Sequence, residues 1–123
     1  MIIGVGVDIV HLPRIAALIA RRGSDGLARR ILSPTEYTEF TAKYKDDPSE
    51  LRYLGSRWCM KEAVYKALYP VHKLEWKQVS VAKKAGKPYL SILNSDLYGI
   101  QKTHVSLSHD GEYAIAQVIL EGA

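Results

Sequence analysis

The stretch RWCMKEAVYKA, residues 57–67, is the part of the chain around which we build the expected fold. It predicts a helix with one apolar stripe, which we expect to pack inward: Met60, Ala63, Val64, Ala67 and Leu68. A second stripe holds two aromatic rings and a carboxylate one turn before an ammonium: Trp58, Glu62, Lys66 and Tyr69. Glutamate before lysine at this spacing favours an exposed ion pair worth about 0.2–0.5 kcal/mol. An ion pair is therefore the simplest interpretation of Glu62 and Lys66.

A helix of about twenty residues is expected to carry this stretch in its second half. Asp47-Pro48-Ser49-Glu50 is a start signal, and Pro70 prevents the helix from continuing beyond Tyr69. Gly55 inside the helix costs about 1 kcal/mol relative to alanine. A packing contact, a bound ligand or chance would each explain this glycine.

The N-terminal residues, Ile2 to Val10, are rich in β-branched side chains and predict a strand that is buried on both faces. Gly4-x-Gly6 lies inside this strand and lacks a third glycine, so it is not a dinucleotide-binding loop. Asp8 is unusual, because a carboxylate in an apolar strand costs several kcal/mol unless it is paired or binds a metal. A position at the strand end, facing solvent or capping the next turn, is the alternative.

Two shorter helices are expected between this strand and the central helix. Pro13 opens the first and Gly23 ends it. Its inner face is apolar: Ile15, Leu18 and Ile19. A turn is expected at Ser24-Asp25-Gly26. Ser33-Pro34-Thr35-Glu36 is a capping box that predicts a second helix to about Lys43.

The second half of the chain is expected to form antiparallel strands: residues 76–84, 89–93, 104–109 and 113–120. Ala85-Gly86-Lys87-Pro88 and Asp110-Gly111 are the expected turns, and Asn94-Ser95-Asp96 caps a short helix through Ile100. The sequence therefore predicts one α+β domain over residues 1–123. Its antiparallel sheet, joined by the N-terminal strand, packs against the long central helix.

Composition limits the class of partner. The 123 residues are 47% hydrophobic, with a formal charge of +4, which favours an anionic partner. No apolar run approaches the roughly 20 residues of a membrane span. The apolar N-terminus lacks a basic leader and a cleavage site, and the one cysteine, Cys59, is expected to be a small core residue. An intracellular, reducing setting fits best.

Four separate elements need one chemical explanation: Asp8, the pair Glu62 and Lys66, Gly86-Lys87-Pro88, and Ser106-Leu107-Ser108-His109. Two carboxylates with few nitrogen or sulfur ligands suit a hard cation such as Mg²⁺. A lysine beside them suits a pyrophosphate, and a histidine after serines can bind phosphate or move a proton. These residues predict magnesium-dependent transfer of a phosphoryl group.

The same residues resemble the signature blocks of the small holo-acyl-carrier-protein synthases, the short, single-lobe class of 4′-phosphopantetheinyl transferases. The matching blocks are Gly6-Val7-Asp8, Trp58 to Ala67, Gly86-Lys87-Pro88 and Ser106 to His109, and the similarity runs from Ile2 to Glu121. The resemblance implies the fold of that family. It also implies transfer of the phosphopantetheine arm of coenzyme A to a serine of an acyl carrier protein, with release of adenosine 3′,5′-bisphosphate.

The resemblance also implies roles for single residues. Asp8 and Glu62 would hold Mg²⁺ against the pyrophosphate, and Lys66 would neutralise the bridging oxygen and protonate the departing bisphosphate. His109 would act at the coenzyme A phosphates. The general base stays open between a metal-bound water, Glu62 and His109. The coenzyme A contacts implied are Arg57, Lys61, Lys66, Gly86, Lys87, Pro88, Ser108 and His109.

The chain departs from the family at Tyr69, where many relatives have glycine near the expected coenzyme A channel. Leu68-Tyr69-Pro70 resembles fungal mitochondrial members, so the expected compartment is the cytoplasm, or the mitochondrial matrix if the source is a fungus.

The resemblance further implies a homotrimer with active sites between subunits, and Gln117 fits either a subunit interface or an outward strand position. An acidic acyl carrier protein would dock on basic residues of the first helix and beyond: Arg14, Arg21, Arg22 and Arg29. A solvated basic surface is the alternative interpretation of these arginines. No membrane and no nucleic acid is expected as a partner.

Two other functions compete with this one. The basic charge permits a nucleic-acid-binding module, but aromatic residues are not interleaved with the arginines as a base-stacking surface requires. A non-catalytic coenzyme A-binding protein is the second alternative. Against it, the full set of Asp8, Glu62, Lys66 and His109 is present.

Overall fold

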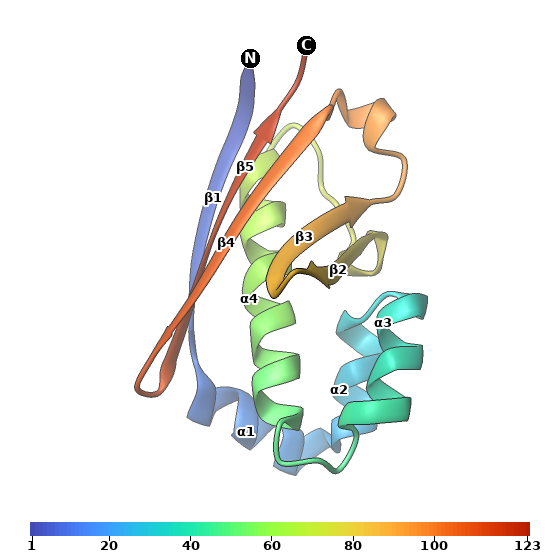
Figure 1. The fold of residues 1–123 in the computed structure, drawn as a ribbon, viewed down its shortest axis with the longest axis vertical. Coiled ribbons are helices and arrows are strands. Elements are labelled where there is room, and N and C mark those ends of the chain that lie inside the picture. The colour runs from blue at the N-terminus through green and yellow to red at the C-terminus, as the bar shows by residue number, and fades with distance from the viewer.

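Helix α4 is the centre of the structure, a computed structural model that describes all 123 residues (Figure 1). The fold is α+β, as predicted. Its elements are β1 (Ile2–His11), α1 (Leu12–Arg22), α2 (Ser24–Ile31), α3 (Pro34–Glu39), η1 (Phe40–Tyr44), α4 (Glu50–Leu68), η2 (Trp76–Gln78), β2 (Val79–Lys84), β3 (Lys87–Ile92), η3 (Ser95–Tyr98), β4 (Lys102–Asp110) and β5 (Tyr113–Glu121). None of these helices has the length and apolar character needed to cross a lipid bilayer.

A three-stranded antiparallel sheet in the order β1-β5-β4 packs one face on α4. Helix and strand backbones approach closely, because a Cβ atom on Gly6 would lie 1.8 Å from the carbonyl oxygen of Ala63. A Cβ on Gly4 would meet the carbonyl of Ala67 in the same way. The two glycines therefore serve helix packing. Strands β2 and β3 form a second, separate hairpin sheet beside α4 and β4.

The prediction that the N-terminal strand is buried on both faces is wrong for the single chain. Gly6 and Val10 face inward and are buried, whereas Val5, Val7 and Ile9 on the outer face are exposed. The cause is topology: β1 is an edge strand, and α4 covers only one face of its sheet. Side chains alternate along a strand, so every second apolar residue remains uncovered.

The helices begin largely where the sequence predicted. The capping box of α3 is formed, since the side chain of Ser33 accepts from the Glu36 amide and the Glu36 carboxylate accepts from the Ser33 amide. The expected turn at Ser24-Asp25-Gly26 is instead the first turn of α2. The break between α1 and α2 lies wholly at Gly23, whose φ of 79° favours glycine.

Helix α4 ends one residue before Tyr69, close to its predicted end, but its start differs in detail. Asp47 accepts hydrogen bonds from both the amide and the hydroxyl of Ser49, so Ser49 does not cap the helix with its side chain. Gly55 has a packing reason: a Cβ there would lie 2.6 Å from the side chain of Leu12. The missing side chain of Gly55 therefore lets Leu12 of α1 pack closely on α4.

The hairpins are those predicted, with small shifts. Ala85 and Gly86 have positive φ values and make the β2–β3 turn, whereas Lys87 and Pro88 already pair in β3. Gly111 makes the β4–β5 turn, and β4 and β5 each extend slightly beyond the predicted bounds. The short helix after Asn94 is a 3₁₀ turn that stops at Tyr98.

Candidate active site

Asp8 lies on the inner face of β1, with 12% of its side chain exposed. The ammonium of Lys66 lies 3.0 Å from its Oδ1 atom and donates a second hydrogen bond to the carbonyl of Val7 at 3.2 Å. The expected ion pair between Glu62 and Lys66 is therefore not formed. Lys66 reaches across to the sheet instead, which brings a strand carboxylate and a helix cation together as the sequence constellation predicted.

Asp8 and Glu62 line a cavity of about 240 Å³ among β1, α1 and α4, which we call the carboxylate cavity. None of the salt bridges of the chain involves Glu62. Two carboxylates are hard donors of the kind that Mg²⁺ binds, together with water and phosphate oxygens. No group of three or more His, Cys, Asp or Glu side chains is placed to hold a metal ion. The pair therefore fits an open Mg²⁺ site, in which water or a ligand supplies the remaining oxygen atoms, and not a closed structural metal site.

His11, at the end of β1, lines the carboxylate cavity as well and was missed in the sequence. Its Nε2 atom lies 3.7 Å from the carboxylate of Glu112 in the β4–β5 turn. Its ring centroid lies 5.0 Å from that of Tyr113. A backbone hydrogen bond from Leu12 to Glu112 joins the hairpin to the start of α1. His11 follows Asp8 by three residues in the same strand, so this short spacing was the local signal that could have found it.

A second cavity, of about 340 Å³, lies between α4, the β2–β3 hairpin and β4, and we call it the basic cavity. Its ionisable residues include no carboxylate but several nitrogen bases: Arg52, Arg57, Lys83 and His109. Gly86 and Pro88, which the resemblance assigns to the nucleotide side, line it too.

Two buried nitrogen atoms of this basic cavity have no hydrogen-bond partner, Nε of Arg57 and Nε2 of His109. Burial, and then the charges of Arg52 and Lys83, lower the pKa of His109. Unsatisfied buried donors are rare in proteins and are commonly completed by a ligand or water. The cavity is therefore suited to an anion.

The two cavities lie on opposite sides of α4 and share no residue. Trp58 and Glu62 face the carboxylate cavity, whereas Ser56 and Met60 face the basic cavity. An offset of two residues corresponds to about 200° around a helix. Within one chain the structure therefore brings together Asp8, Glu62 and Lys66, but it places His109 elsewhere.

Lys61 does not fit its expected place at the nucleotide, because its side chain is 0% exposed. Its ammonium pairs with Glu36, which is also buried. Burial lowers the pKa of Lys61, and the Glu36 carboxylate opposes that shift. Arg57 is buried as well, with its Cζ atom 3.8 Å from the ring centroid of Tyr53, yet it still lines the basic cavity.

The remaining predicted residues point away from both cavities or into the core. Ser108 is exposed on the outer face of β4, and Lys87 lines a separate surface cavity with His104. The thiol of Cys59 donates to the carbonyl of Asp8, and burial raises its pKa to about 12. Cys59 is a core residue, as predicted, and the raised pKa disfavours a nucleophilic role.

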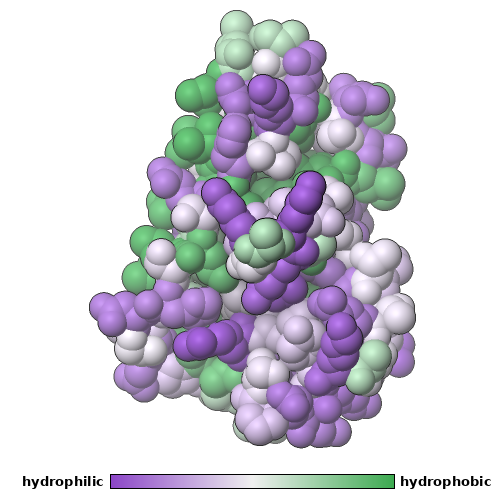
Figure 2. Space-filling model, in the orientation of Figure 1, coloured by the Kyte–Doolittle hydropathy of each residue, from purple (hydrophilic) through white to green (hydrophobic).

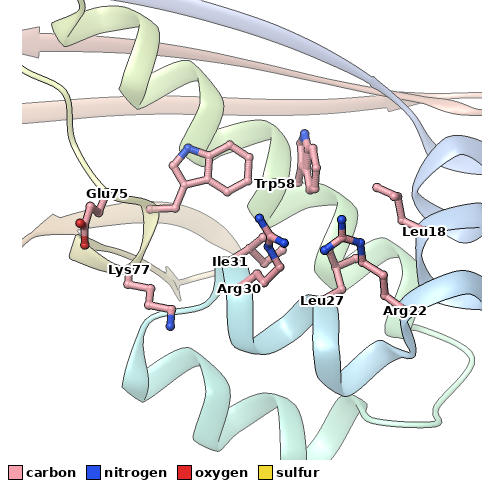
Figure 3. Close-up of a pocket in the computed structure, with 9 residues that line it drawn as sticks. Leu18, Arg22, Leu27, Arg30, Ile31, Trp58, Glu75 and Lys77 are labelled. Atoms are coloured by element: carbon pink, nitrogen blue, oxygen red, sulfur yellow. The ribbon is translucent and has the colours of Figure 1, made fainter.

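A third cavity, of about 540 Å³, lies between α1, α2, α4 and residues 75–77, and we call it the tryptophan groove (Figure 3). Its walls are apolar: Leu18, Leu27, Ile31, Trp58 and Trp76. Arg22 and Arg30 extend from α1 and α2 toward Trp58, and Lys77 adds a third cation. Trp58 also lines the carboxylate cavity, so the groove adjoins the site of Asp8 and Glu62.

The sequence is similar to a described family over nearly its whole length. A family profile described as the 4′-phosphopantetheinyl transferase superfamily matches residues 4–118. The holo-[acyl-carrier-protein] synthase of Edwardsiella ictaluri is 42% identical over 98% of both chains. The protein of that name from Bacillus velezensis is 36% identical over 98% of this chain and 97% of its own.

Solved structures agree with the sequence matches. The holo-[acyl-carrier-protein] synthase of Neisseria meningitidis superposes with a TM-score of 0.84 at 30% identity, covering 98% of this chain and 99% of the other. The Helicobacter pylori synthase in complex with coenzyme A has a TM-score of 0.77 at 29% identity, covering 95% and 99%. Fold and sequence thus lead to one conclusion: the chain belongs to the 4′-phosphopantetheinyl transferase superfamily.

Proposed function

We propose that this chain transfers the 4′-phosphopantetheine arm of coenzyme A to a serine of an acyl carrier protein and releases adenosine 3′,5′-bisphosphate. The observation that carries the proposal is the pair Asp8 and Glu62 at one cavity, with Lys66 paired to Asp8, beside a groove with basic side chains. The names of the relatives, and the coenzyme A in the Helicobacter pylori complex, support this pair of substrates. The ion pair and the free carboxylate favour catalysis over passive binding of coenzyme A.

The chemistry at the carboxylate cavity depends on charge neutralisation. Asp8 and Glu62 would hold Mg²⁺, which when bound neutralises the pyrophosphate of coenzyme A. The serine oxygen of the carrier bonds to the phosphorus that bears the pantetheine arm, and the bond from that phosphorus to the bisphosphate oxygen breaks. Lys66, with 48% of its side chain exposed, neutralises and protonates this leaving oxygen. Glu62 and His11 line this cavity and can accept the serine proton.

The basic cavity would hold the nucleotide part of coenzyme A. Arg52, Lys83 and His109 offer positive charge or hydrogen-bond donors to phosphate oxygens, and Gly86 and Pro88 border the same space. An anionic phosphate would provide a hydrogen-bond partner for Nε2 of His109, which has none within the chain.

We further propose that the active form is a homotrimer in which each site joins the carboxylate cavity of one subunit to the basic cavity of the next. The support is that the two cavities lie on opposite sides of α4 in a single chain and share no lining residue. The outer sheet face is also apolar and exposed, at Val5, Val7, Ile9 and Ile115. Figure 2 shows hydrophobic side chains along the margin where this sheet lies. Gln117 is exposed on the same face.

The acidic carrier would dock on the basic surface of α1 and on the tryptophan groove beside it. Arg14, Arg21 and Arg22 are exposed and available. Arg29 is a weaker candidate, because its Nε atom already lies 2.7 Å from the carboxylate of Asp25. Arg30, which the sequence interpretation left out, lines the groove instead. We expect the reaction inside the cell, where coenzyme A is made and where the free thiol of Cys59 stays reduced.

Intact-mass measurement of an apo carrier protein tests the function directly. With coenzyme A and Mg²⁺ we expect the carrier mass to rise by about 340 Da, and EDTA should abolish this gain. Absence of any gain with several acidic carriers and fresh coenzyme A would refute the enzymatic proposal.

A further inference from the structure

Lys61 is next to Glu62 in sequence but plays no part in either charged cavity. Its ammonium donates to the carbonyl oxygen of Trp76 at 3.0 Å and to that of Val79, and it pairs with Glu36. A lysine ammonium has three N–H donors, and these three acceptors satisfy all of them. A buried ammonium is tolerated only with such compensation, so the side chain is fixed in one place.

One of these acceptors, the carbonyl of Trp76, lies in the short segment between α4 and β2, and another, the carbonyl of Val79, belongs to the first residue of β2. Residues Tyr69 to Glu75, which lead to Trp76, form neither helix nor strand. The bond from Lys61 therefore ties the backbone of Trp76 to the rigid central helix.

The ring of Trp76 packs edge-to-face on that of Trp58, with centroids 5.0 Å apart and an interplanar angle of 78°. Both rings are walls of the tryptophan groove. Since Trp58 stands on α4 and Trp76 is tied to α4 through Lys61, one helix sets the spacing of both walls.

We propose that Lys61 is a positioning residue for carrier recognition, which holds Trp76 against Trp58 and so sets the width of the tryptophan groove. The proposal rests on the proposed function. The groove fits an apolar side chain of the carrier flanked by carboxylates, because its apolar walls lie among three cations and one carboxylate: Arg22, Arg30, Lys77 and Glu75. Lys61 touches neither substrate, so its effect should appear in recognition of the carrier and not in coenzyme A binding.

The test uses the two tryptophans, which are the only ones in the chain. Two indoles in edge-to-face contact couple, and their exciton couplet in circular dichroism reports the contact in the free protein. Lys61→Met keeps a similar side-chain length but removes the three hydrogen bonds. We expect it to lose more than about half of the couplet and to raise KM for the carrier about tenfold, with kcat and the Kd for coenzyme A within about twofold.

Trp76→Ala is the companion variant, and it keeps the proposal testable if Lys61→Met does not fold. It retains the backbone carbonyl that Lys61 binds, and we expect the same rise in carrier KM with unchanged coenzyme A binding. An intact couplet in Lys61→Met, or an unchanged carrier KM in either variant, would overturn the proposal. Weakened coenzyme A binding in Lys61→Met would also overturn it. The couplet needs no substrate, so failure of the proposed transfer in the wild type is distinguished from failure of the role of Lys61.

Discussion

The two sides of α4 compensate their charges in different ways. On one side, Asp8 already has a cation at 3.0 Å, and of the two carboxylates in the cavity only Glu62 lacks a charged partner. On the other side, Arg52 and Lys83 lie in one cavity with His109, and no carboxylate lines that cavity. Burial and these two cations lower the pKa of His109. The first arrangement is preorganised before a ligand arrives. In the second, Arg57 already pairs with Glu36 and Glu39, whereas Arg52 and Lys83 have no carboxylate partner and await an incoming anion.

This difference suggests a division of labour between the two sides. Preorganised charges stabilise a transition state without reorganisation, so the carboxylate cavity should control kcat. Unbalanced cations bind the anion in the ground state and the transition state alike, so the basic cavity should control KM for coenzyme A. Substitutions on the two sides should therefore separate the two kinetic constants.

The largest effect is expected for Glu62→Gln. Glutamine keeps the shape but loses the charge that would hold Mg²⁺, so kcat should fall on the order of 100-fold or more while the thermal unfolding midpoint changes little. Initial rates of carrier modification measure this. Glu50→Gln is the matched control, since Glu50 is the other glutamate of α4 and lines neither cavity. Turnover close to wild type in Glu62→Gln would remove Glu62 from the metal site.

Mixing two variants, each nearly inactive when coenzyme A is kept well below KM, tests whether the two sides meet between subunits. One chain carries Glu62→Gln and the other carries Lys83→Gln with His109→Ala. In a randomly mixed trimer, about a quarter of the sites combine an intact carboxylate cavity with an intact basic cavity. Co-expressed, differently tagged chains should therefore recover about a quarter of wild-type activity. No recovery in verified mixed trimers would mean that each site lies within one subunit.

A smaller effect, on KM for coenzyme A, should distinguish two neighbouring lysines of β2. Lys83 lines the basic cavity, whereas Lys84 lines the surface cavity with Lys87. Lys83→Gln should raise KM for coenzyme A about tenfold with kcat nearly unchanged, as expected for one charge-assisted contact. Lys84→Gln should leave KM for coenzyme A within about twofold of the wild-type value. Equal effects of the two substitutions would show that general positive charge, and not the cavity, attracts coenzyme A.

The elements that the sequence predicted well are those defined by local signals. The capping box at Ser33 and Glu36 is formed, and Pro70 follows the end of α4 closely. The hairpin turns at Gly86 and Gly111 are also present. Each of these depends on residues a few positions apart, whose backbone preferences do not require the rest of the fold.

What the sequence could not predict depends on which element meets which side of α4. Lys61 and Glu62 are adjacent, yet one is buried against Glu36 and the other faces a cavity. Helical periodicity predicts that their side chains point in different directions from α4. Lys61 is enclosed only because α3 and β2 pack over it, which the sequence does not show. The separation of His109 from Asp8 has the same origin, because β5 lies between their strands.

The smallest effect concerns pH and the stability of the basic cavity. The pKa of His109 is held below its ordinary value of 6.5, by burial and then by Arg52 and Lys83. Below that ordinary value the unfolded chain binds the proton and the folded chain resists it, so His109 lowers the stability as the pH falls. The Tm of the wild type should therefore fall more steeply than that of His109→Gln when the pH is lowered from about 7.5 to about 5.5. Calorimetry at constant ionic strength measures this difference in Tm. His72→Gln is the control, because His72 lines neither cavity. Coenzyme A should reduce this difference in Tm between the variants, because a bound phosphate favours the protonated imidazole. Parallel curves of Tm against pH for the wild type and His109→Gln would mean that burial and the neighbouring cations do not lower the pKa of His109.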